Sequence, residues 1–369
     1  MTDSLRPLVQ AYDAGAPLER AATPPSEWYF DPRFDALERV AVFARTWQLV
    51  ARLDQLAEPG CFVTAEFAGE PIVITRGQDG TLRAFYNVCR HHAAEVMNES
   101  QGRAGKLRCP YHGWTYSLEG ELIGCPEFRE VREFDKARNG LVPIRLETWE
   151  NLVFVNLSSD APSLREQLGS AAEQIASLRV ASLKFHERRT YDLNCNWKVF
   201  VDNYLDGGYH VPHIHKGLAG VLDYAEYRIT NGERYCLQAS PVDSAGGDSE
   251  TSAVRGGEMA YYYWIYPNLM LNWYEGYLDT NLTLPIDANH CRVIFDFYFA
   301  DGVQQRDKSI AVAERVQQED IDVCESVQRG VGSRSYDTGR LSVRREAGEQ
   351  LFHKLLAADL RAELESPPE

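Results

Sequence analysis

The chain has 369 residues, of which 44% are hydrophobic and 25% are charged, the composition of a globular protein with two or three structural units. Its formal net charge of −16 argues against nucleic-acid binding. The sequence has no run of about 18 apolar residues, and its first residues lack the basic and apolar segments of a secretion signal. We therefore expect no membrane span, and the eight scattered cysteines fit a reducing cytoplasm.

The N-terminal part of the chain combines an arm, a helix and short strands. Residues 1–30 are polar and contain Pro24 and Pro25, which favours an extended arm, and the apolar spacing over residues 34–47 predicts a helix. Short β-like runs separated by glycines follow between residues 48 and 157, for example at 61–63, 71–74, 114–116 and 152–155. This pattern predicts a small all-β unit.

The remainder of the chain mixes helices and strands. Helices are predicted over residues 163–178, 301–329 and 344–363, and strands near residues 188–193, 227–238, 258–273 and 291–300. Antiparallel strands with segregated helices define an α+β unit. We therefore expect an all-β unit followed by a larger α+β unit.

Two short loops of the all-β unit each pair a cysteine with a histidine. Cys89 and His91 are followed by Cys109 and His112. This spacing suits a two-iron, two-sulfide cluster of the Rieske type, in which the cysteines hold one iron and the histidines hold the other. A zinc site usually pairs cysteine with cysteine along the chain, and a disulfide would leave both histidines without a role. We predict a [2Fe-2S] cluster bound by these four residues.

A second group of histidines lies in the α+β unit. His210 and His215 are five residues apart, which on a straight helix would point them to different sides. Pro212 interrupts a helix between them and lets the chain turn. This spacing alone is weak, because surface or core histidines would explain it as well. A cluster upstream that donates electrons needs an acceptor, which favours a non-haem iron held by two histidines and one carboxylate.

The long helix over residues 301–329 offers that carboxylate. The expected apolar stripe of the helix contains Ala313, Val316, Val323, Cys324 and Val327. Asp320 falls in the middle of this stripe, whereas Asp322 lies on the opposite face and Glu319 lies to one side. A carboxylate on a buried face is costly unless it binds a cation or forms hydrogen bonds. Asp320 is therefore the predicted third iron ligand, and a buried salt bridge is the alternative.

These motifs together resemble the catalytic subunit of the Rieske non-haem iron oxygenases, over nearly the whole chain. The resemblance is carried, in chain order, by Cys89-Arg90-His91, Cys109-Pro110-Tyr111-His112, Asn196-Trp197-Lys198, the pair His210 and His215, and Glu319-Asp320. Within the family the chain is most similar to the choline monooxygenase branch, through residues 202–210 and 324–330.

The resemblance implies a domain organisation and an assembly. Residues 1–45 would form an N-terminal arm and helix that pack on the catalytic domain, and residues 46–157 a Rieske [2Fe-2S] domain. Residues 158–369 would form a catalytic domain of the helix-grip type, an antiparallel sheet with helices around a mononuclear Fe(II). The family also implies a homotrimeric ring in which the cluster of one subunit lies beside the iron of the next.

The resemblance also points to candidate catalytic residues. Many ring-hydroxylating members have an acidic residue three positions before the first iron-binding histidine, where it bridges the two metal centres. Here that position is Gly207, and Asp206 precedes it. The bridge is therefore expected at Asp206 or Asp202, and Asn203 between them is a further catalytic candidate.

The implied activity is hydroxylation of a C–H bond with O2 and with electrons from a ferredoxin or flavin reductase. Between residues 83 and 108, five basic residues against two acidic ones form a candidate docking face for the reductase, or they only offset the anionic cluster. One alternative is a ring-hydroxylating or demethylating oxygenase of an aromatic substrate. Another is a Rieske electron-transfer protein whose second histidine group is structural.

Aromatic residues between positions 258 and 277 indicate a substrate class. Aromatic faces bind quaternary ammonium groups through cation–π contacts. The candidate lining residues are Tyr263, Trp264, Trp273, Tyr274 and Glu275. Because alternate residues of a strand face opposite sides, at most half of the aromatic residues can line one cavity, and sheet core is the alternative. A quaternary ammonium or N-methyl compound such as choline is the predicted substrate.

Overall fold

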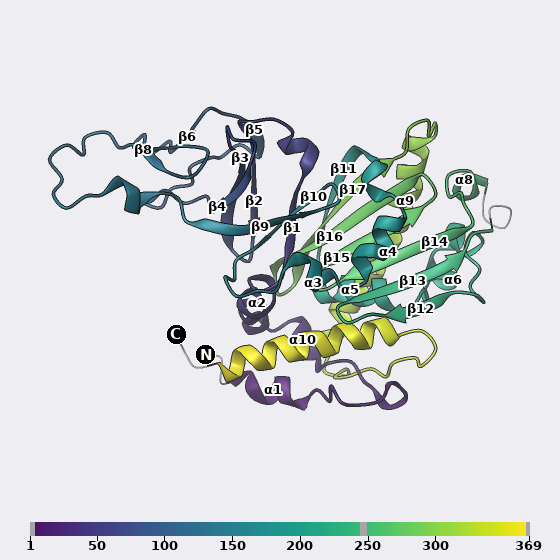
Figure 1. The fold of residues 1–369 in the computed structure, drawn as a ribbon. Helices are drawn as coiled ribbons and strands as arrows, with labels where there is room; N and C mark the ends of the chain where they lie inside the picture. The colour runs from purple at the N-terminus through teal and green to yellow at the C-terminus, as the bar shows by residue number, and fades with distance from the viewer. Residues whose placement is uncertain (1–3, 244–248, 367–369) are drawn as a thin grey trace. The chain divides into compact units, whose positions relative to one another are not determined.

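The chain folds into two compact units. The computed structural model describes residues 4–243 and 249–366. One unit is formed by Phe43–Gln167, and the other by Met1–Val42 together with Leu168–Glu369. Figure 1 follows the chain through both units.

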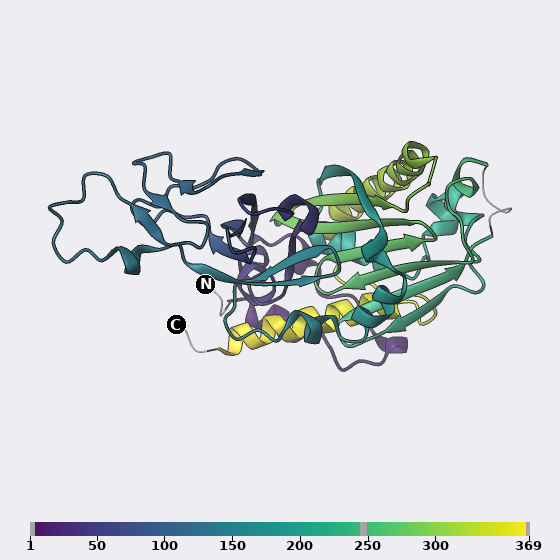
Figure 2. The ribbon, with the colours of Figure 1, turned by 45° about the horizontal axis from the view of Figure 1, so that its top comes forward.

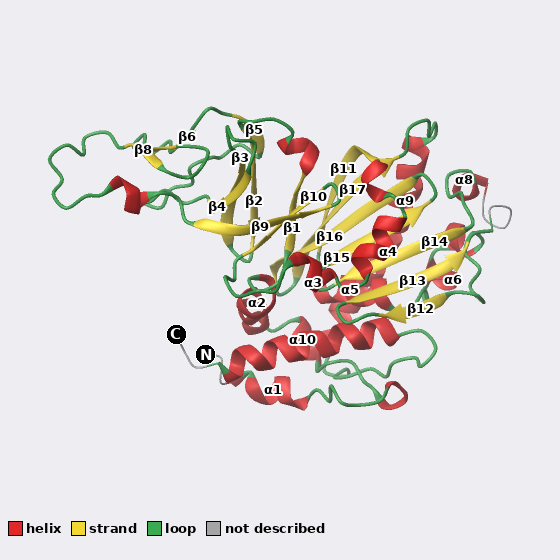
Figure 3. Ribbon diagram, viewed as in Figure 1, coloured by secondary structure: helices red, strands yellow, loops and turns green. Residues whose placement is uncertain are grey.

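The smaller unit is built from antiparallel strands, as the sequence predicts (Figure 3). Its larger sheet has the order β1-β10-β9-β4-β3-β2-β5. These strands are β1 Gln48–Arg52, β2 Cys61–Phe67, β3 Glu70–Arg76, β4 Leu82–Tyr86, β5 Gln101–Arg103, β9 Pro143–Trp149 and β10 Leu152–Asn156. A second sheet, in the order β6-β7-β8, contains β6 Leu107–Arg108, β7 Thr115–Tyr116 and β8 Leu122–Gly124. The loop with Cys89 and His91 lies between β4 and β5, and the loop with Cys109 and His112 connects β6 to β7.

The larger unit contains one seven-stranded antiparallel sheet in the order β11-β17-β16-β15-β14-β13-β12. Its strands are β11 Lys184–Leu193, β12 Arg228–Asn231, β13 Tyr235–Pro241, β14 Met259–Ile265, β15 Leu269–Tyr274, β16 Tyr277–Asp287 and β17 His290–Phe299. The longer helices are α5 Trp197–Leu205, α9 Arg306–Val331 and α10 Ala347–Glu365. The shorter helices of the chain are α1 Arg6–Ala11, α2 Pro32–Glu38, α3 Leu164–Leu168, α4 Ala171–Ser177, α6 Val211–Ile214, α7 Lys216–Ala219 and α8 Ser249–Ser252. This arrangement confirms the α+β class.

Helices cover both faces of the large sheet. Helices α5 and α9 lie over the face that carries Tyr262 and enclose a cavity against it. Helix α4 lies over the other face, where Gln174 donates a hydrogen bond to the Tyr235 hydroxyl at 2.9 Å and accepts one from the Tyr263 hydroxyl at 3.3 Å. Neighbouring residues of a strand face opposite sides. Tyr262 and Tyr263 therefore belong to different layers of the unit.

The two ends of the larger unit lie side by side. Helix α1 packs along α10 in both ribbon views (Figure 1, Figure 2). The Arg361 guanidinium on α10 donates to the Val9 carbonyl at 3.2 Å, and the Arg6 guanidinium on α1 donates to the Leu364 carbonyl at 2.5 Å. These contacts join the N-terminal arm to the C-terminal helix.

A buried ion pair joins the N-terminal arm to helix α5. The Asn196 side chain caps α5 by accepting a hydrogen bond from the Lys198 amide at 3.1 Å. The Lys198 ammonium and the Trp197 indole each donate to the Glu38 carboxylate at 2.7 Å. Glu38 and Lys198 are both only 1% exposed. The Asn-Trp-Lys motif therefore fixes the start of the helix that leads to the second histidine group.

The structure differs from the prediction in several elements. The predicted strands near residues 227–238 and 258–273 are each two strands, β12 with β13 and β14 with β15. The predicted helix over residues 34–47 is α-helical to Glu38, continues as a π-helix over Arg39–Phe43 and ends before β1. The predicted helix over residues 163–178 is divided into α3 and α4 at Gly169, which has a φ of +54°. Strand β16 was not predicted at all, because its inward positions include Asp279 and Asn281 and the segment therefore reads as polar loop.

No helix in the described ranges has the length and apolar character needed to cross a bilayer.

Candidate metal centres

The two cysteine–histidine loops of the smaller unit have the same backbone turn. The Cys89 amide bonds to the Ala94 carbonyl and the Cys109 amide to the Trp114 carbonyl, both at 2.8 Å. One residue earlier, the amides of Ala93 and Gly113 bond back to the carbonyls of the two cysteines at 3.0 and 3.1 Å. Both turns are closed by a left-handed residue, Ala93 with φ +59° and Gly113 with φ +72°. The loops thus present their ligand side chains in an equivalent way.

The side chains of these two loops lie close together. The His91 and His112 rings lie 4.8 Å apart, and His91 stacks on Trp114 with 4° between the planes. Cys89 and Cys109 are each 3% exposed, and burial raises the pKa of the Cys109 thiol. The buried Nδ1 atom of His91 has no hydrogen-bond partner among the described residues. An apolar thiol site and an unpartnered imidazole nitrogen fit a bound metal cluster.

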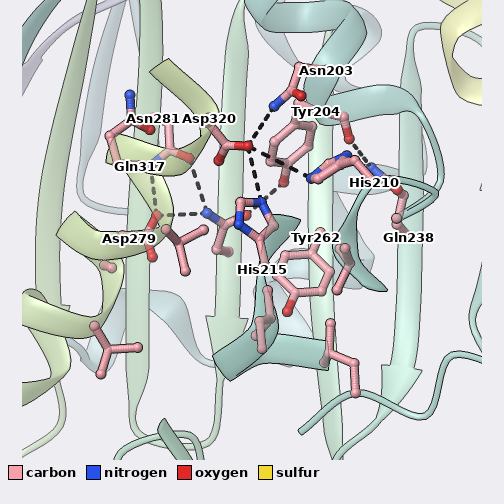
Figure 4. A pocket seen from close by; sticks show the side chains of 18 of the residues that line it. Asn203, Tyr204, His210, His215, Gln238, Tyr262, Asp279, Asn281, Gln317 and Asp320 are labelled. Carbon is pink, nitrogen blue, oxygen red and sulfur yellow. Dashed lines mark hydrogen bonds and ion pairs between the residues drawn. The ribbon is translucent and has the colours of Figure 1, made fainter. Parts of the chain in front are cut away.

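In the larger unit, the turn after α5 brings His210 and His215 to one centre. The His210 and His215 rings lie 4.9 Å apart and nearly perpendicular. Their Nε2 atoms lie 3.8 and 3.1 Å from the same oxygen of Asp320 on α9. Figure 4 shows these three side chains pointing toward one another. The three ligand atoms lie within 4.8 Å of each other, which suits a single metal ion.

Two further carboxylates and an amide orient these three side chains. The His210 Nδ1 lies 2.5 Å from Asp206, and the His215 Nδ1 lies 2.7 Å from Glu319. The Asn203 amide donates to Asp320 at 2.8 Å. A carboxylate on Nδ1 leaves Nε2 free for a metal and fixes the ring orientation, as is usual for metal-binding histidines. Sequence reasoning missed this role of Glu319, although its position next to Asp320 was a signal.

The inward face of α9 is shifted from the predicted stripe. Asp320 lies one turn after buried Gln317 and one turn before buried Cys324, so its placement on the inner face agrees with the prediction. Val327, however, is 44% exposed, and the prediction that it belongs to the apolar stripe was wrong.

Asp202 points into a different cluster from Asp206. Its carboxylate accepts from the Tyr29 hydroxyl at 2.7 Å and lies 2.8 Å from the His353 Nε2. Glu349 is buried beside it, and burial raises the pKa of this carboxyl group well above its ordinary value. Asp206 contacts an imidazole of the second centre directly, whereas Asp202 contacts His353 of α10 and Tyr29 of the N-terminal arm.

A cavity extends from the His210, His215 and Asp320 side chains between the sheet and helices α5 and α9. It encloses about 870 Å³ of atom-free space, part of which is open to solvent. The aromatic residues that line it are Phe200, Tyr204, Tyr227, Tyr262, Tyr274 and Phe295. The polar residues of its wall away from the histidines are Gln238, Arg255, Asn272, Asp279, Asn281 and Gln317. An apolar lining with a few convergent polar groups is typical of a substrate site.

Of the five predicted substrate residues, only Tyr274 lines this cavity. Tyr263 faces α4, and the Trp273 ring packs against Tyr261 with 5.7 Å between centroids and the planes tilted by 44°. Trp264 packs against Phe352 of α10, and its indole donates to the Pro267 carbonyl at 3.1 Å. Glu275 lines a separate hollow near Gly256 and Val303. The prediction was wrong for these four residues for different reasons. Tyr263 and Trp273 face the other side of the sheet, which the sequence alone does not decide. Trp264 shares the face of Tyr262 but is covered by α10, and Glu275 follows the end of β15.

Comparison with known proteins agrees with both centres. Residues 46–135 match the family model of the Rieske [2Fe-2S] domain, and residues 180–362 match that of the ring hydroxylating alpha subunit (catalytic domain). Choline monooxygenase of Arabidopsis thaliana is 39% identical over 369 aligned positions, covering 96% of this chain and 86% of that protein. The carnitine monooxygenase oxygenase subunit of Escherichia coli (strain K12) is 33% identical and covers 92% of this chain and 94% of that protein.

A solved structure is also similar over most of the chain. It is that of a quaternary ammonium Rieske monooxygenase, solved to study carnitine oxidation and inter-subunit electron transfer. The two structures superpose with a TM-score of 0.84 at 31% sequence identity, over 92% of this chain and 96% of that one. The chain therefore belongs to the Rieske non-haem iron oxygenases, which are oxidoreductases with a [2Fe-2S] cluster and a mononuclear iron. Within this family it is homologous to the choline and carnitine monooxygenases. Membership in an enzyme family excludes the alternative of a pure electron carrier.

Proposed function

We propose that this oxygenase hydroxylates a C–H bond of a quaternary ammonium or N-methyl compound. The observation that carries the proposal is the cavity beside the three converging ligand side chains. Its wall combines tyrosine rings with the buried carboxylate of Asp279, which is 3% exposed and forms no ion pair in the described part of the chain. Aromatic faces and one nearby anion are the groups that attract a trimethylammonium cation. The choline and carnitine monooxygenases named above support the same substrate class.

We assign the metal ligands from the geometry of the two units. Cys89, His91, Cys109 and His112 would hold the [2Fe-2S] cluster, and His210, His215 and Asp320 the mononuclear iron. When bound, the cluster supplies electrons one at a time and the iron activates O2. The other residues of the site hold the ligand side chains in place and shape the cavity. Asp206 and Glu319 hold the two imidazoles, Asn203 holds Asp320, and the tyrosine-lined cavity limits the access of water to the reacting carbon.

We further propose a homotrimer with electron transfer between subunits and a ferredoxin or flavin reductase as the electron donor. The inter-subunit electron transfer described for the solved monooxygenase supports this arrangement. Of the predicted basic docking face, Arg83 pairs with Asp79 at 2.8 Å and Arg103 with Glu58 at 2.7 Å. Arg90, Lys106 and Arg108 are exposed and remain the candidates for contact with an acidic donor. The eight free cysteines fit a reducing compartment, for which we propose the cytoplasm.

The substrate class can be tested with pairs of compounds that differ only in charge. Reconstituted protein and a surrogate reductase would be supplied with choline, L-carnitine and γ-butyrobetaine, and with neutral isosteres in which carbon replaces the ammonium nitrogen. We expect substrate-dependent O2 consumption and hydroxylated or dealkylated product with at least one cationic compound and none with its isostere. Equal turnover of the isosteres, or turnover of aromatic acids alone, would disprove the proposal.

Asp206 and Asp202 can be separated as candidates for the bridge between the metal centres. Asp206→Asn keeps an acceptor oxygen next to His210 but removes the charge, so both metals should stay bound. We expect reoxidation of the reduced cluster by substrate and O2 to slow by roughly 10- to 100-fold in stopped-flow absorbance. Asp202→Asn, whose contacts are Tyr29 and His353, serves as the matched control and should reoxidise at the normal rate. The reverse pattern would assign the bridge to Asp202.

A further inference from the structure

A buried arginine lies in the wall of the cavity, away from the iron ligands. Arg255 is 4% exposed and lines the same cavity as His210 and Asp320. Its Nη1 donates to the Ser309 hydroxyl of α9 at 2.5 Å, and its Nη2 lies 3.3 Å from the Ser309 carbonyl. The guanidinium also lies over the rings of Tyr277 and Tyr274, at 4.3 and 5.2 Å from their centroids. The side chain is thus held in one position by its neighbours.

This cation has no anionic partner among the residues that the structure describes. Its hydrogen bonds go to the neutral groups of Ser309 and Tyr277, and it forms no ion pair with a carboxylate. A guanidinium has five N–H donors, and Nε forms no hydrogen bond with the described part of the chain. A buried charge is costly unless it is paired. An anionic group of a bound ligand would satisfy both the charge and the remaining donors.

The nearest balancing group is Asp279, but a tyrosine separates it from the arginine. The Arg255 Nη2 lies 3.4 Å from the Tyr277 hydroxyl, which in turn donates to Asp279 at 2.6 Å. The other hydrogen bonds to Asp279 come from the amides of Asn272 and Asn281, at 2.8 and 2.6 Å. The cavity wall therefore presents a separated cation and anion. A ligand with only a positive charge would leave the arginine unmatched, whereas a ligand that also carries an anionic group would match it.

Helix α9 gives the scale of the distance between the iron ligands and Arg255. Asp320 and Ser309 are eleven residues apart on the helix, which corresponds to about 16 Å along its axis. Gln317 lies between them, one turn from Asp320, and is 2% exposed with its Nε2 lacking a hydrogen-bond partner among the described residues. A ligand that reaches from the iron ligands to Arg255 would pass this unpaired amide. Such a ligand needs several carbon atoms between its two ends.

We propose that the substrate is a zwitterionic ammonium carboxylate whose carboxylate binds the Arg255 guanidinium, with several carbons separating it from the ammonium group. This inference rests on the proposed function, because it describes the far end of the same substrate site. Arg255 is a specificity-determining residue in this proposal. The carboxylate oxygens accept hydrogen bonds from the guanidinium, tyrosine rings of the cavity surround the ammonium group, and the carbon next to it lies at the iron. Choline, which has no carboxylate, is then a poor substrate.

The test compares ligands that differ only in the carboxylate. Binding of γ-butyrobetaine, its methyl ester, glycine betaine and choline to the metal-loaded protein would be measured by calorimetry, which needs no reductase, and turnover would be measured separately. We expect γ-butyrobetaine to bind about 30-fold or more tightly than its methyl ester, since a hydrogen-bonded charge is lost in the ester. Glycine betaine should bind weakly, because one carbon between its charged groups cannot span the cavity.

Variants assign the preference to Arg255. Arg255→Met should bring the affinities for the acid and the ester to within about threefold of each other, while affinity for the ester is kept. Arg255→Lys keeps the charge and should keep part of the preference for the acid over the ester. This second variant keeps the test valid if Arg255→Met fails to fold. Arg234→Met is the control, since Arg234 lies over the Tyr266 ring at 4.5 Å and does not line the cavity. The control should keep the full preference.

The possible outcomes separate this inference from the proposed function. If choline or the ester binds and turns over as well as γ-butyrobetaine, the proposed function stands and the role of Arg255 is wrong. If the acid is preferred equally by wild type and Arg255→Met, another group binds the carboxylate and the assignment is wrong. If no quaternary ammonium compound binds or turns over, both proposals fail. Only a preference for the acid that disappears with Arg255 supports the inference.

Discussion

In the His210→Ala variant, substrate-dependent O2 consumption is expected to fall about a thousandfold or more, while the visible absorption of the [2Fe-2S] cluster is retained. His210 and His215 supply two of the three converging ligand atoms, and Asp320 supplies the third. Loss of one imidazole leaves two ligands and an Asp206 carboxylate without its ring partner. The cluster loops belong to the other compact unit of the chain, so their fold and their metal should be unaffected.

Metal analysis and spectroscopy would check this result together. Wild-type protein should contain three irons per chain, two in the cluster and one in the mononuclear site, and the variant should contain two. His213→Ala is the matched control, because His213 is exposed on the same short helix and should keep three irons and full turnover. Full occupancy of the mononuclear site in His210→Ala, or loss of the cluster absorption, would contradict the assignment of two separate centres.

The Lys198→Met variant is expected to lose about 3–5 kcal/mol of the free energy of unfolding, because it leaves the Glu38 carboxylate buried without its cation. Burial lowers the pKa of the Lys198 ammonium and raises the pKa of the Glu38 carboxyl, so each group needs the other to stay charged. Their 2.7 Å contact joins the N-terminal arm to α5, the helix that precedes His210. Urea unfolding followed by circular dichroism would measure the loss.

A double variant distinguishes the lost charge pair from lost packing. Glu38→Gln with Lys198→Met removes both charges, while the glutamine oxygen can still accept from the Trp197 indole. We expect this variant to regain most of the stability that Lys198→Met loses. Lys308→Met on the exposed side of α9 should change the free energy of unfolding by no more than about 0.5 kcal/mol. A double variant as unstable as Lys198→Met would show that the ion pair is not the cause.

The ligand sets could be read from the sequence because each is short in sequence or fixed by helix periodicity. Cys89 and His91 lie within one turn, as do Cys109 and His112, and His210 and His215 flank a single proline. A turn of a few residues leaves little freedom, so spacing and side-chain chemistry suffice to predict convergence. The prediction of Asp320 as a ligand required only that the inward face of one helix be identified. The error at Val327 did not change which face that was.

The carboxylates that orient the histidines were only partly predictable. Asp206 is four residues before His210 and was selected from the sequence, although as a bridge between centres. Glu319 was placed to one side of α9, which is where the structure has it, but its contact with His215 spans 104 residues. Helix periodicity gives the direction in which a side chain points. Which residue it contacts in that direction depends on how two elements pack.

The amino-acid sequence by itself determined the fold class, the order of the two units and the residues that converge on each metal centre, because these follow from local periodicity and from ligand chemistry at short range. Only the tertiary structure decided the substrate wall. It selects Tyr262 in place of Tyr263 and brings Arg255, Asp279 and Gln317 into one cavity. These residues come from different elements, and no local pattern says which face of a sheet the helices will enclose.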